Sequence, residues 1–256
     1  MRSAIASPAN TPEPLAERRG RVAGTGSSLR QRGRLTALLL VCAAVASFTV
    51  APQANANAST ERFDFDVLFD DRPVGNHRFE IVRDGAEEQV LSVAAFDIKA
   101  LLVFRFSYRH EAREAWQDGC LRRLSSTTDD NGKRFDVSIT PAAEGLTVVQ
   151  RAPKSDTRHL AEGCAASFAY WDLARLQRGD ALINAQNGAR VPIRLQREGT
   201  ETFRSELAER YRLEPEGMDP MTLWYRKGDG RWLGLEVRQP VGVLRYQPST
   251  ASAAGG

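Results

Sequence analysis

Residues 105–139 constrain the fold of this chain more than any other stretch of the sequence. Two turn signals, Asp118-Gly119 and Asp129-Asp130-Asn131-Gly132, divide it into three runs rich in Phe, Tyr, Thr, Val and Ile. Asp-Gly and Asn-Gly adopt the positive φ angles that tight hairpin turns require. The stretch therefore predicts a three-stranded antiparallel meander. It indicates a fold class without indicating a chemistry.

Similar strand patterns recur along the rest of the chain. In residues 63–70, Phe63, Phe65, Val67 and Phe69 fall on one face of a strand and Asp64, Asp66 and Asp70 on the other, as in a half-buried strand. One short helix is expected over Cys164–Gln177, where Phe168 and Trp171 fall at helical spacing, and residues 152–163 are expected to form a loop. Further strands are expected at residues 77–83, 89–95, 146–151, 191–196, 209–213, 222–226, 232–237 and 241–246. About ten to twelve strands predict a mainly β fold, with one large curved antiparallel sheet that is barrel-like or a half-barrel.

Residues 96–106 break the alternation, because few polar residues interrupt an apolar run. One interpretation is a bulged strand that is buried on both faces. The other is a hydrophobic lip at a ligand cavity or at a partner surface. On the second interpretation Leu101, Leu102 and Phe104 are candidate ligand-binding residues.

The first 58 residues differ from the rest of the chain. An Arg- and Ser-rich start precedes the uncharged sixteen-residue run Leu35–Val50, and small residues then alternate up to Ala58. These are the three parts of a secretory signal peptide, so we expect cleavage after Ala58 and a periplasmic or secreted protein. The alternative is retention as an anchor, although a membrane span needs about 20 residues. Residues 59–247 are then expected to form a single domain, followed by a disordered tail over 248–256.

The leader also accounts for the basic character of the sequence. Residues 1–58 hold seven Arg and two Glu, which leaves 28 basic and 30 acidic residues and a net charge of −2. A slightly acidic chain does not favour nucleic acid or an anionic membrane as a partner.

The sequence contains no convergent catalytic motif. The three histidines have no metal-ligand spacing, and no Gly-x-Ser-x-Gly elbow occurs. We therefore expect neither a metal nor a cofactor. A hydrolase would have to use His110 with Glu111 or Glu114. If the segment is a strand, however, His110 and Glu111 lie on opposite faces.

Aromatic and cysteine residues give the remaining candidates. Trp116, Trp171 and Trp224 are candidate ligand-binding residues, although Trp on a hairpin arm usually packs in a core. Cys120 and Cys164 remain after removal of the leader, and an even number of cysteines in an exported chain favours a disulfide between them. Such a bond would join the meander to the start of the expected helix.

A family resemblance rests on motifs that occur in order along the mature chain. They are Val74-Gly75-x-His77-x-Phe79, Tyr108-Arg109-His110, Glu114-x-Trp116-x-x-Gly119-Cys120-Leu121, Thr128-Asp129-Asp130-Asn131-Gly132, Cys164-x-x-Ser167-Phe168-Ala169-Tyr170-Trp171, Leu182-Ile183-Asn184 with Gln186-x-Gly188, and Leu223-Trp224-Tyr225. On these residues the chain resembles a family of exported bacterial proteins catalogued as domain of unknown function 6134. The long leader departs from the family pattern. The resemblance implies no activity.

Three functional hypotheses follow. The first is an exported protein of the bacterial cell envelope with a non-catalytic binding or structural role, whose partner is a small apolar molecule or an envelope protein. The second is a periplasmic carrier of a lipid or other apolar ligand, because the layout is distantly similar to the curved sheets of periplasmic lipoprotein carriers. The third is the hydrolase described above.

Overall fold

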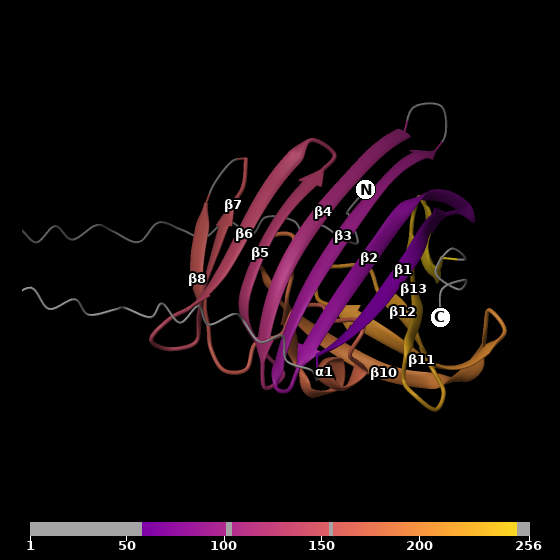
Figure 1. Ribbon diagram of the computed structural model, residues 1–256. Coiled ribbons are helices and arrows are strands. Elements are labelled where there is room, and N and C mark those ends of the chain that lie inside the picture. The colour runs from indigo at the N-terminus through magenta and orange to yellow at the C-terminus, as the bar shows by residue number, and fades with distance from the viewer. Residues whose placement is uncertain (1–57, 101–103, 154–155, 250–256) are drawn as a thin grey trace, which may run out of the picture. The chain divides into compact units, whose positions relative to one another are not determined.

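One strongly curved antiparallel sheet dominates the computed structural model, which describes residues 58–100, 104–153 and 156–249 (Figure 1). The sheet contains fourteen strands, more than the ten to twelve expected, and one helix accompanies it. The elements are β1 (Ser59–Phe69), β2 (Arg72–Asp84), β3 (Glu87–Ala100), β4 (Phe104–Gln117), β5 (Cys120–Asp130), β6 (Lys133–Pro141), β7 (Leu146–Arg151), β8 (Thr157–Ala161), α1 (Leu173–Arg178), β9 (Ala181–Ile183), β10 (Arg190–Phe203), β11 (Glu206–Pro215), β12 (Met221–Arg226), β13 (Trp232–Gln239) and β14 (Gly242–Pro248).

Almost every strand pairs with its neighbours in the sequence. There are two exceptions. β1 pairs with β14, and β8 and β9 do not pair with each other but form the two edges of the sheet. The first and last strands therefore meet in the middle of the sheet, and the sheet is not closed into a barrel. Residues 162–189 connect the edge strand β8 to β10 and include α1 and the other edge strand, β9. We call them the inner segment because many of their apolar side chains pack in the core of the sheet.

The meander predicted from the turn signals is confirmed. Asp118 and Gly119 have φ angles of 52° and 76°, and Asn131 and Gly132 have φ angles of 53° and 83°. Left-handed geometry at two successive residues is that of a type I′ hairpin turn. These turns place β4, β5 and β6 side by side.

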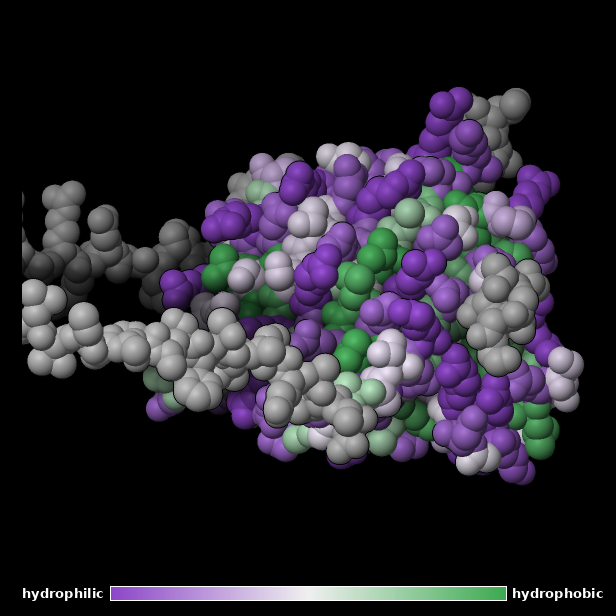
Figure 2. Space-filling view, in the orientation of Figure 1, coloured by the Kyte–Doolittle hydropathy of each residue, from purple (hydrophilic) through white to green (hydrophobic). Residues whose placement is uncertain are grey.

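The alternation of apolar and acidic residues in β1 places one face of the strand in the core and the other in solvent, as expected. Phe63, Phe65, Val67 and Phe69 are at most 4% exposed and belong to the main core, which lies on what we call the inner face of the sheet. The opposite face carries charged residues, and the view in Figure 2 is mostly hydrophilic. Ion pairs on this outer face include Arg78 with Asp64. The sheet thus follows the rule that an antiparallel strand has one buried and one solvated face.

The interpretation of residues 96–106 as one bulged strand is wrong. β3 ends at Ala100, β4 begins at Phe104, and these two residues pair with each other. The run is therefore divided between the two arms of a hairpin. Phe96 and Ile98 are buried, whereas Ala95 is half-buried and Asp97 and Lys99 are exposed, so β3 keeps its alternation. Between Ala100 and Phe104 the sequence contains no Gly, Asn or Asp, the residues that mark other turns of this protein, so the pattern does not predict a hairpin here.

Two other expectations change at the inner segment. The helix comprises only six residues, Leu173–Arg178. It begins at Leu173 because Asp172 caps it and accepts a hydrogen bond from the backbone N–H of Arg175. The region expected to be a loop contains the edge strand β8. A short polar edge strand carries little hydrophobic periodicity, so pattern analysis does not detect it.

A second, smaller core lies apart from the main one. Ala208, Trp224 and Leu233 form it, and Phe203 stacks on Trp224 with ring centroids 4.5 Å apart. No helix in the described part of the chain is long and apolar enough to cross a membrane.

Candidate functional site

Small residues on the inner face of β2–β4 create room for a cavity. Ala94 on β3 lies opposite His77 of β2 and His110 of β4, so a methyl group separates two imidazole-bearing positions. In the next inward-facing row, Ser92 of β3 lies opposite Ala112 of β4. Because these side chains are short, the inner face is hollow at this point.

The inner segment covers this hollow. Backbone hydrogen bonds fix its course, from Leu121 N–H to the Ala165 carbonyl (2.8 Å) and from Ile183 N–H to the Ala166 carbonyl (2.7 Å). Together with strands of the sheet it lines a partly open cavity of about 100 Å³. The cavity is lined by His77, Phe79, Ser92, Tyr108, His110, Ala112, Glu114, Ser167, Phe168, Tyr170, Trp171, Asn184, Ala185, Gln186, Met218, Met221, Leu235, Val237, Leu244 and Tyr246.

Both histidines in the cavity are held by hydrogen bonds to hydroxyl groups. Nε2 of His77 lies 2.8 Å from Oγ of Ser92, and its Nδ1 lies 3.2 Å from the Tyr246 hydroxyl. Nδ1 of His110 lies 2.8 Å from Oγ1 of Thr128. Burial lowers the pKa of His110 to about 4 and holds the pKa of His77 well below its ordinary value, with a smaller contribution from the neighbouring His110. Both imidazoles are therefore neutral at pH 7.

Glu114 is the carboxyl group of the cavity. It lies on the inner face of β4, where its Oε2 accepts hydrogen bonds from Oγ of Ser167 and Nε1 of Trp116, each at 2.9 Å. Burial raises the pKa of Glu114 to about 7, although the two hydrogen bonds act in the opposite direction. This carboxyl group therefore titrates near neutral pH.

Tyrosine hydroxyls supply further hydrogen-bonding groups. The Tyr108 hydroxyl accepts a hydrogen bond from the amide of Gln186. The Tyr170 hydroxyl donates to the sulfur of Met221 at 3.4 Å, and a thioether is a weak acceptor. Burial raises the pKa of both tyrosines above the ordinary value, so both are neutral donors.

The structure brings together only two of the three residues proposed for a hydrolase. Glu111 lies on the exposed outer face of β4 and pairs with Arg113 at 2.9 Å. His110 and Glu114 both line the cavity, but each makes its hydrogen bonds to other side chains. His159 lies on β8 and does not line this cavity.

The six candidate ligand-binding residues have different positions. Trp171 lines the cavity and Trp116 donates a hydrogen bond to its carboxyl group, whereas Trp224 belongs to the second core. Leu101 and Leu102 lie outside the described residues, and Phe104 begins β4. A role for these six residues in binding stays a prediction.

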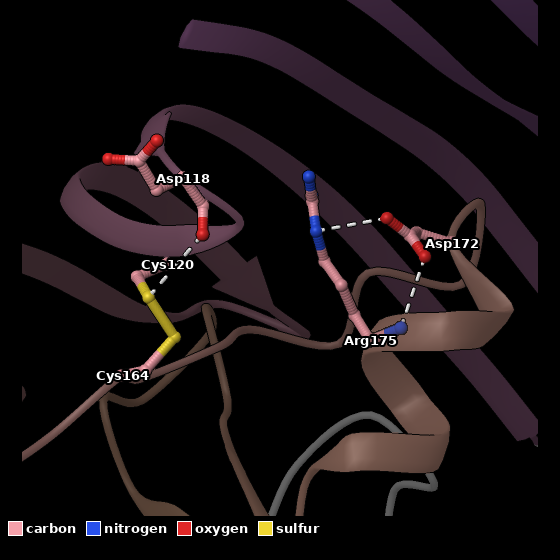
Figure 3. The surroundings of a disulfide bond; sticks show 5 residues. All are labelled: Asp118, Cys120, Cys164, Asp172 and Arg175. Atoms are coloured by element: carbon pink, nitrogen blue, oxygen red, sulfur yellow. Dashed lines mark hydrogen bonds and ion pairs between the residues drawn. A yellow bond between two sulfur atoms is a disulfide. The ribbon is translucent and has the colours of Figure 1, made fainter. Parts of the chain in front are cut away.

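Cys120 and Cys164 form a disulfide, as the sequence predicted, with their Cα atoms 4.9 Å apart. The bond joins the first residue of β5 to the inner segment (Figure 3). It therefore fixes the cover of the cavity to the sheet.

A buried ion pair holds the other part of the inner segment. Nη1 of Arg175 lies 2.6 Å from Glu88 of β3, and both side chains are less than 10% exposed. Arg175 also stacks over the ring of Trp116 at 4.3 Å. Its Nε lies 3.0 Å from Asp172 without hydrogen-bond geometry (Figure 3), so this contact is electrostatic.

Replacing Asp172 with Ala is expected to lower the free energy of unfolding by about 1 kcal/mol, the usual effect of losing a helix cap. Asp172→Asn should retain most of this stability because an amide oxygen also caps. The matched control is Asp180→Ala, whose carboxyl group is almost fully exposed. Urea denaturation measures all three, and equal losses in Asp172→Ala and Asp180→Ala would contradict the assignment.

Several residues of the cavity were missed from the sequence, among them His77, Tyr108, Tyr170, Gln186 and Tyr246. Inward-facing His or Tyr on an amphipathic strand is a signal for such sites, but it is shared with ordinary core positions. Their convergence depends on pairing across many strands. Among the described residues, no group of three or more His, Cys, Asp and Glu is arranged to hold a metal ion.

Comparison with known families adds one assignment. A family model described as domain of unknown function (DUF6134) matches residues 65–249. The chain belongs to the DUF6134 family. The match extends from β1 to the end of the described region and includes every residue that lines the cavity, so the resemblance found in the sequence is confirmed. A search of curated proteins finds no match to this DUF6134 chain.

A search of solved structures finds a protein with a similar fold. This DUF6134 domain is similar to a β-barrel-like protein of domain of unknown function DUF1849 from Brucella abortus, with a TM-score of 0.50 and 11% sequence identity. The alignment covers 73% of this chain and 94% of that chain. At this identity the likeness shows the fold alone, and it agrees with the barrel-like class expected from the sequence.

Proposed function

We propose that this protein is an exported protein of the bacterial envelope that binds a small molecule in the cavity beneath the inner segment. The observation that supports binding is a partly open cavity of about 100 Å³ with histidine, tyrosine, carboxyl and amide groups around it. Ligand sites combine an apolar wall with a few polar groups in this way. The signal-like leader and the disulfide support export.

The size of the cavity favours a compact ligand over a lipid. Sites for drug-sized ligands usually have about 300–1,000 Å³, several times the volume present here. An apolar cavity of about 150 Å³ accommodates a molecule such as benzene. Transport of a long acyl chain would require displacement of the inner segment, which a disulfide and a buried ion pair hold in place.

Replacing Ala112 with Leu is expected to abolish binding, because the larger side chain would occupy the cavity. Ala115→Leu is the matched control, since Ala115 lies on the same strand and outside the lining. Native mass spectrometry of protein exported to the periplasm should show a bound small molecule on the wild type and on Ala115→Leu. The same spectra give the N-terminus of the mature chain.

Circular dichroism and the intact disulfide serve as folding controls for both variants. The proposal would be contradicted if Ala112→Leu carried the same molecule at the same occupancy as the wild type. It would also be contradicted if the wild type carried no small molecule in any preparation.

A further inference from the structure

The charges around the cavity are unbalanced. Glu114 is a buried carboxyl group in the lining, and no Arg or Lys belongs to the lining among the described residues. The histidines are also neutral at pH 7 because burial lowers their pKa values. A buried carboxylate without a cationic partner is costly, so the cavity itself favours a ligand that supplies positive charge.

Among the described residues, the one arginine that acts on Glu114, Arg175, and the arginine that shares its partner Glu88 already have acidic partners. Arg175 pairs with Glu88 and Asp172. It lowers the pKa of Glu114 only slightly, and the charge of Glu88 acts on this pKa in the opposite direction. Arg83 pairs with Glu61 at 2.8 Å and with Glu88 at 2.9 Å.

Arg231 completes this chain of charges by pairing with Glu61 at 2.9 Å. Three arginines thus balance three acidic residues: Glu61, Glu88 and Asp172. Glu114 is outside that balance.

The remaining walls suit an organic cation. Aromatic rings present a negative face to a cation, and thioether sulfur is soft and polarisable. The lining contains both kinds of side chain, namely the aromatic residues Phe79, Tyr108, Phe168, Tyr170, Trp171 and Tyr246 and the methionines Met218 and Met221. An aromatic enclosure beside a carboxylate is an arrangement that recognises ammonium groups.

We propose that the cavity binds a small organic monocation, an amine or a methylated ammonium group, with Glu114 as its counter-charge. This inference rests on the proposed binding function and specifies its ligand class. The volume of about 100 Å³ limits the buried part of the ligand to a compact group. The weakly satisfied Tyr170 hydroxyl and the amide of Asn184 would receive a polar substituent of the ligand.

The test compares two probes of nearly the same shape. Choline carries a permanent positive charge, and 3,3-dimethylbutan-1-ol replaces its nitrogen with carbon and is neutral. Isothermal titration calorimetry at pH 8 should find choline bound at least about tenfold more tightly than the alcohol, the range expected of a desolvated cation–π and charge contact. Glu114→Gln should remove this preference, whereas Glu111→Gln, exposed on the opposite face of β4, should retain it.

The pH dependence of the wild type provides a measurement that needs no variant. Choline does not titrate, the pKa of His110 is lowered to about 4 by burial, and burial also holds the pKa of His77 well below its ordinary value. With the pKa of Glu114 near 7, the ionised fraction falls about tenfold between pH 8 and pH 6, and the affinity for choline should fall by the same factor. Glu88 and Arg175, which also act electrostatically on Glu114, form an ion pair with each other.

The outcomes separate this inference from the proposed function. Equal or tighter binding of the alcohol would overturn the cation assignment and leave small-molecule binding in place. Binding of neither probe would also overturn the cation assignment, and the mass comparison of wild type with Ala112→Leu would then decide the binding function. Choline binding that is unchanged in Glu114→Gln and between pH 6 and pH 8 would remove Glu114 as the counter-charge.

Discussion

A protein without the Cys120–Cys164 disulfide is expected to lose about 4 kcal/mol of its free energy of unfolding, as loop-closure entropy predicts for this sequence separation. The bond closes a loop between residues 44 positions apart. Without it the unfolded chain gains conformational freedom. The double variant Cys120→Ser and Cys164→Ser should therefore unfold at a markedly lower urea concentration than the oxidised wild type.

The positions of the two cysteines allow the effect of the disulfide to be measured without a large loss of packing. Cys164 is exposed and Cys120 is only partly buried, so replacement by Ser removes little packing. Wild-type protein reduced with dithiothreitol is the matched control and should unfold with the double variant. A difference below about 1 kcal/mol between oxidised wild type and the variant would show that the loop-entropy estimate does not apply here.

Much of the fold follows from local sequence, and the meander shows why. Asn131-Gly132 and Asp118-Gly119 allow few conformations other than tight turns, so the pairing of β4, β5 and β6 is specified within a few residues. The β3–β4 hairpin carries no such signal, and its apolar run resembles a buried strand. Likewise, the pairing of β1 with β14 joins opposite ends of the chain, and no local pattern encodes it.

The candidate site was less accessible to sequence analysis than the fold. Phe168 and Trp171 have helical spacing, but residues 165–171 pack against the core without forming a helix, and the chain becomes helical only at Leu173. The cavity arises because Ala94 falls between His77 and His110 in the strand register. A one-residue change in register would turn these side chains to solvent. Such a site depends on tertiary alignment.

Glu114→Gln is expected to become more stable relative to the wild type as the pH rises from about 4.5 to about 7, with a total gain of about 3 kcal/mol. The pKa of Glu114 is raised from 4.5 to about 7 in the folded protein. Between these values the folded state binds more protons than the unfolded state, so ionisation of this group makes the wild type less stable as the pH increases. Gln does not titrate, so the variant does not lose stability in this way as the pH increases.

The titration of His110 also changes the stability of the wild type with pH, so the effect of Glu114 has to be measured as the difference between the wild type and Glu114→Gln. Its pKa is lowered from 6.5 to about 4 by burial, so the stability it contributes is present above pH 6.5 and is lost as the pH falls toward 4. This effect has the opposite sign to that of Glu114, and the two offset each other in the wild type. Because His110 is present in both proteins, its contribution cancels in the difference.

Urea denaturation at pH 4, 5.5 and 8, with dialysed protein and an intact disulfide, measures that difference. A value that rises from pH 4 to pH 8 supports a desolvated carboxyl group at Glu114, whereas a constant value would show that Glu114 titrates near its ordinary pKa. Choline added at pH 8 should then stabilise the wild type more than Glu114→Gln, because a ligand stabilises only the state that binds it. The same carboxyl group would thus be a source of instability in the free protein and a binding determinant in the complex.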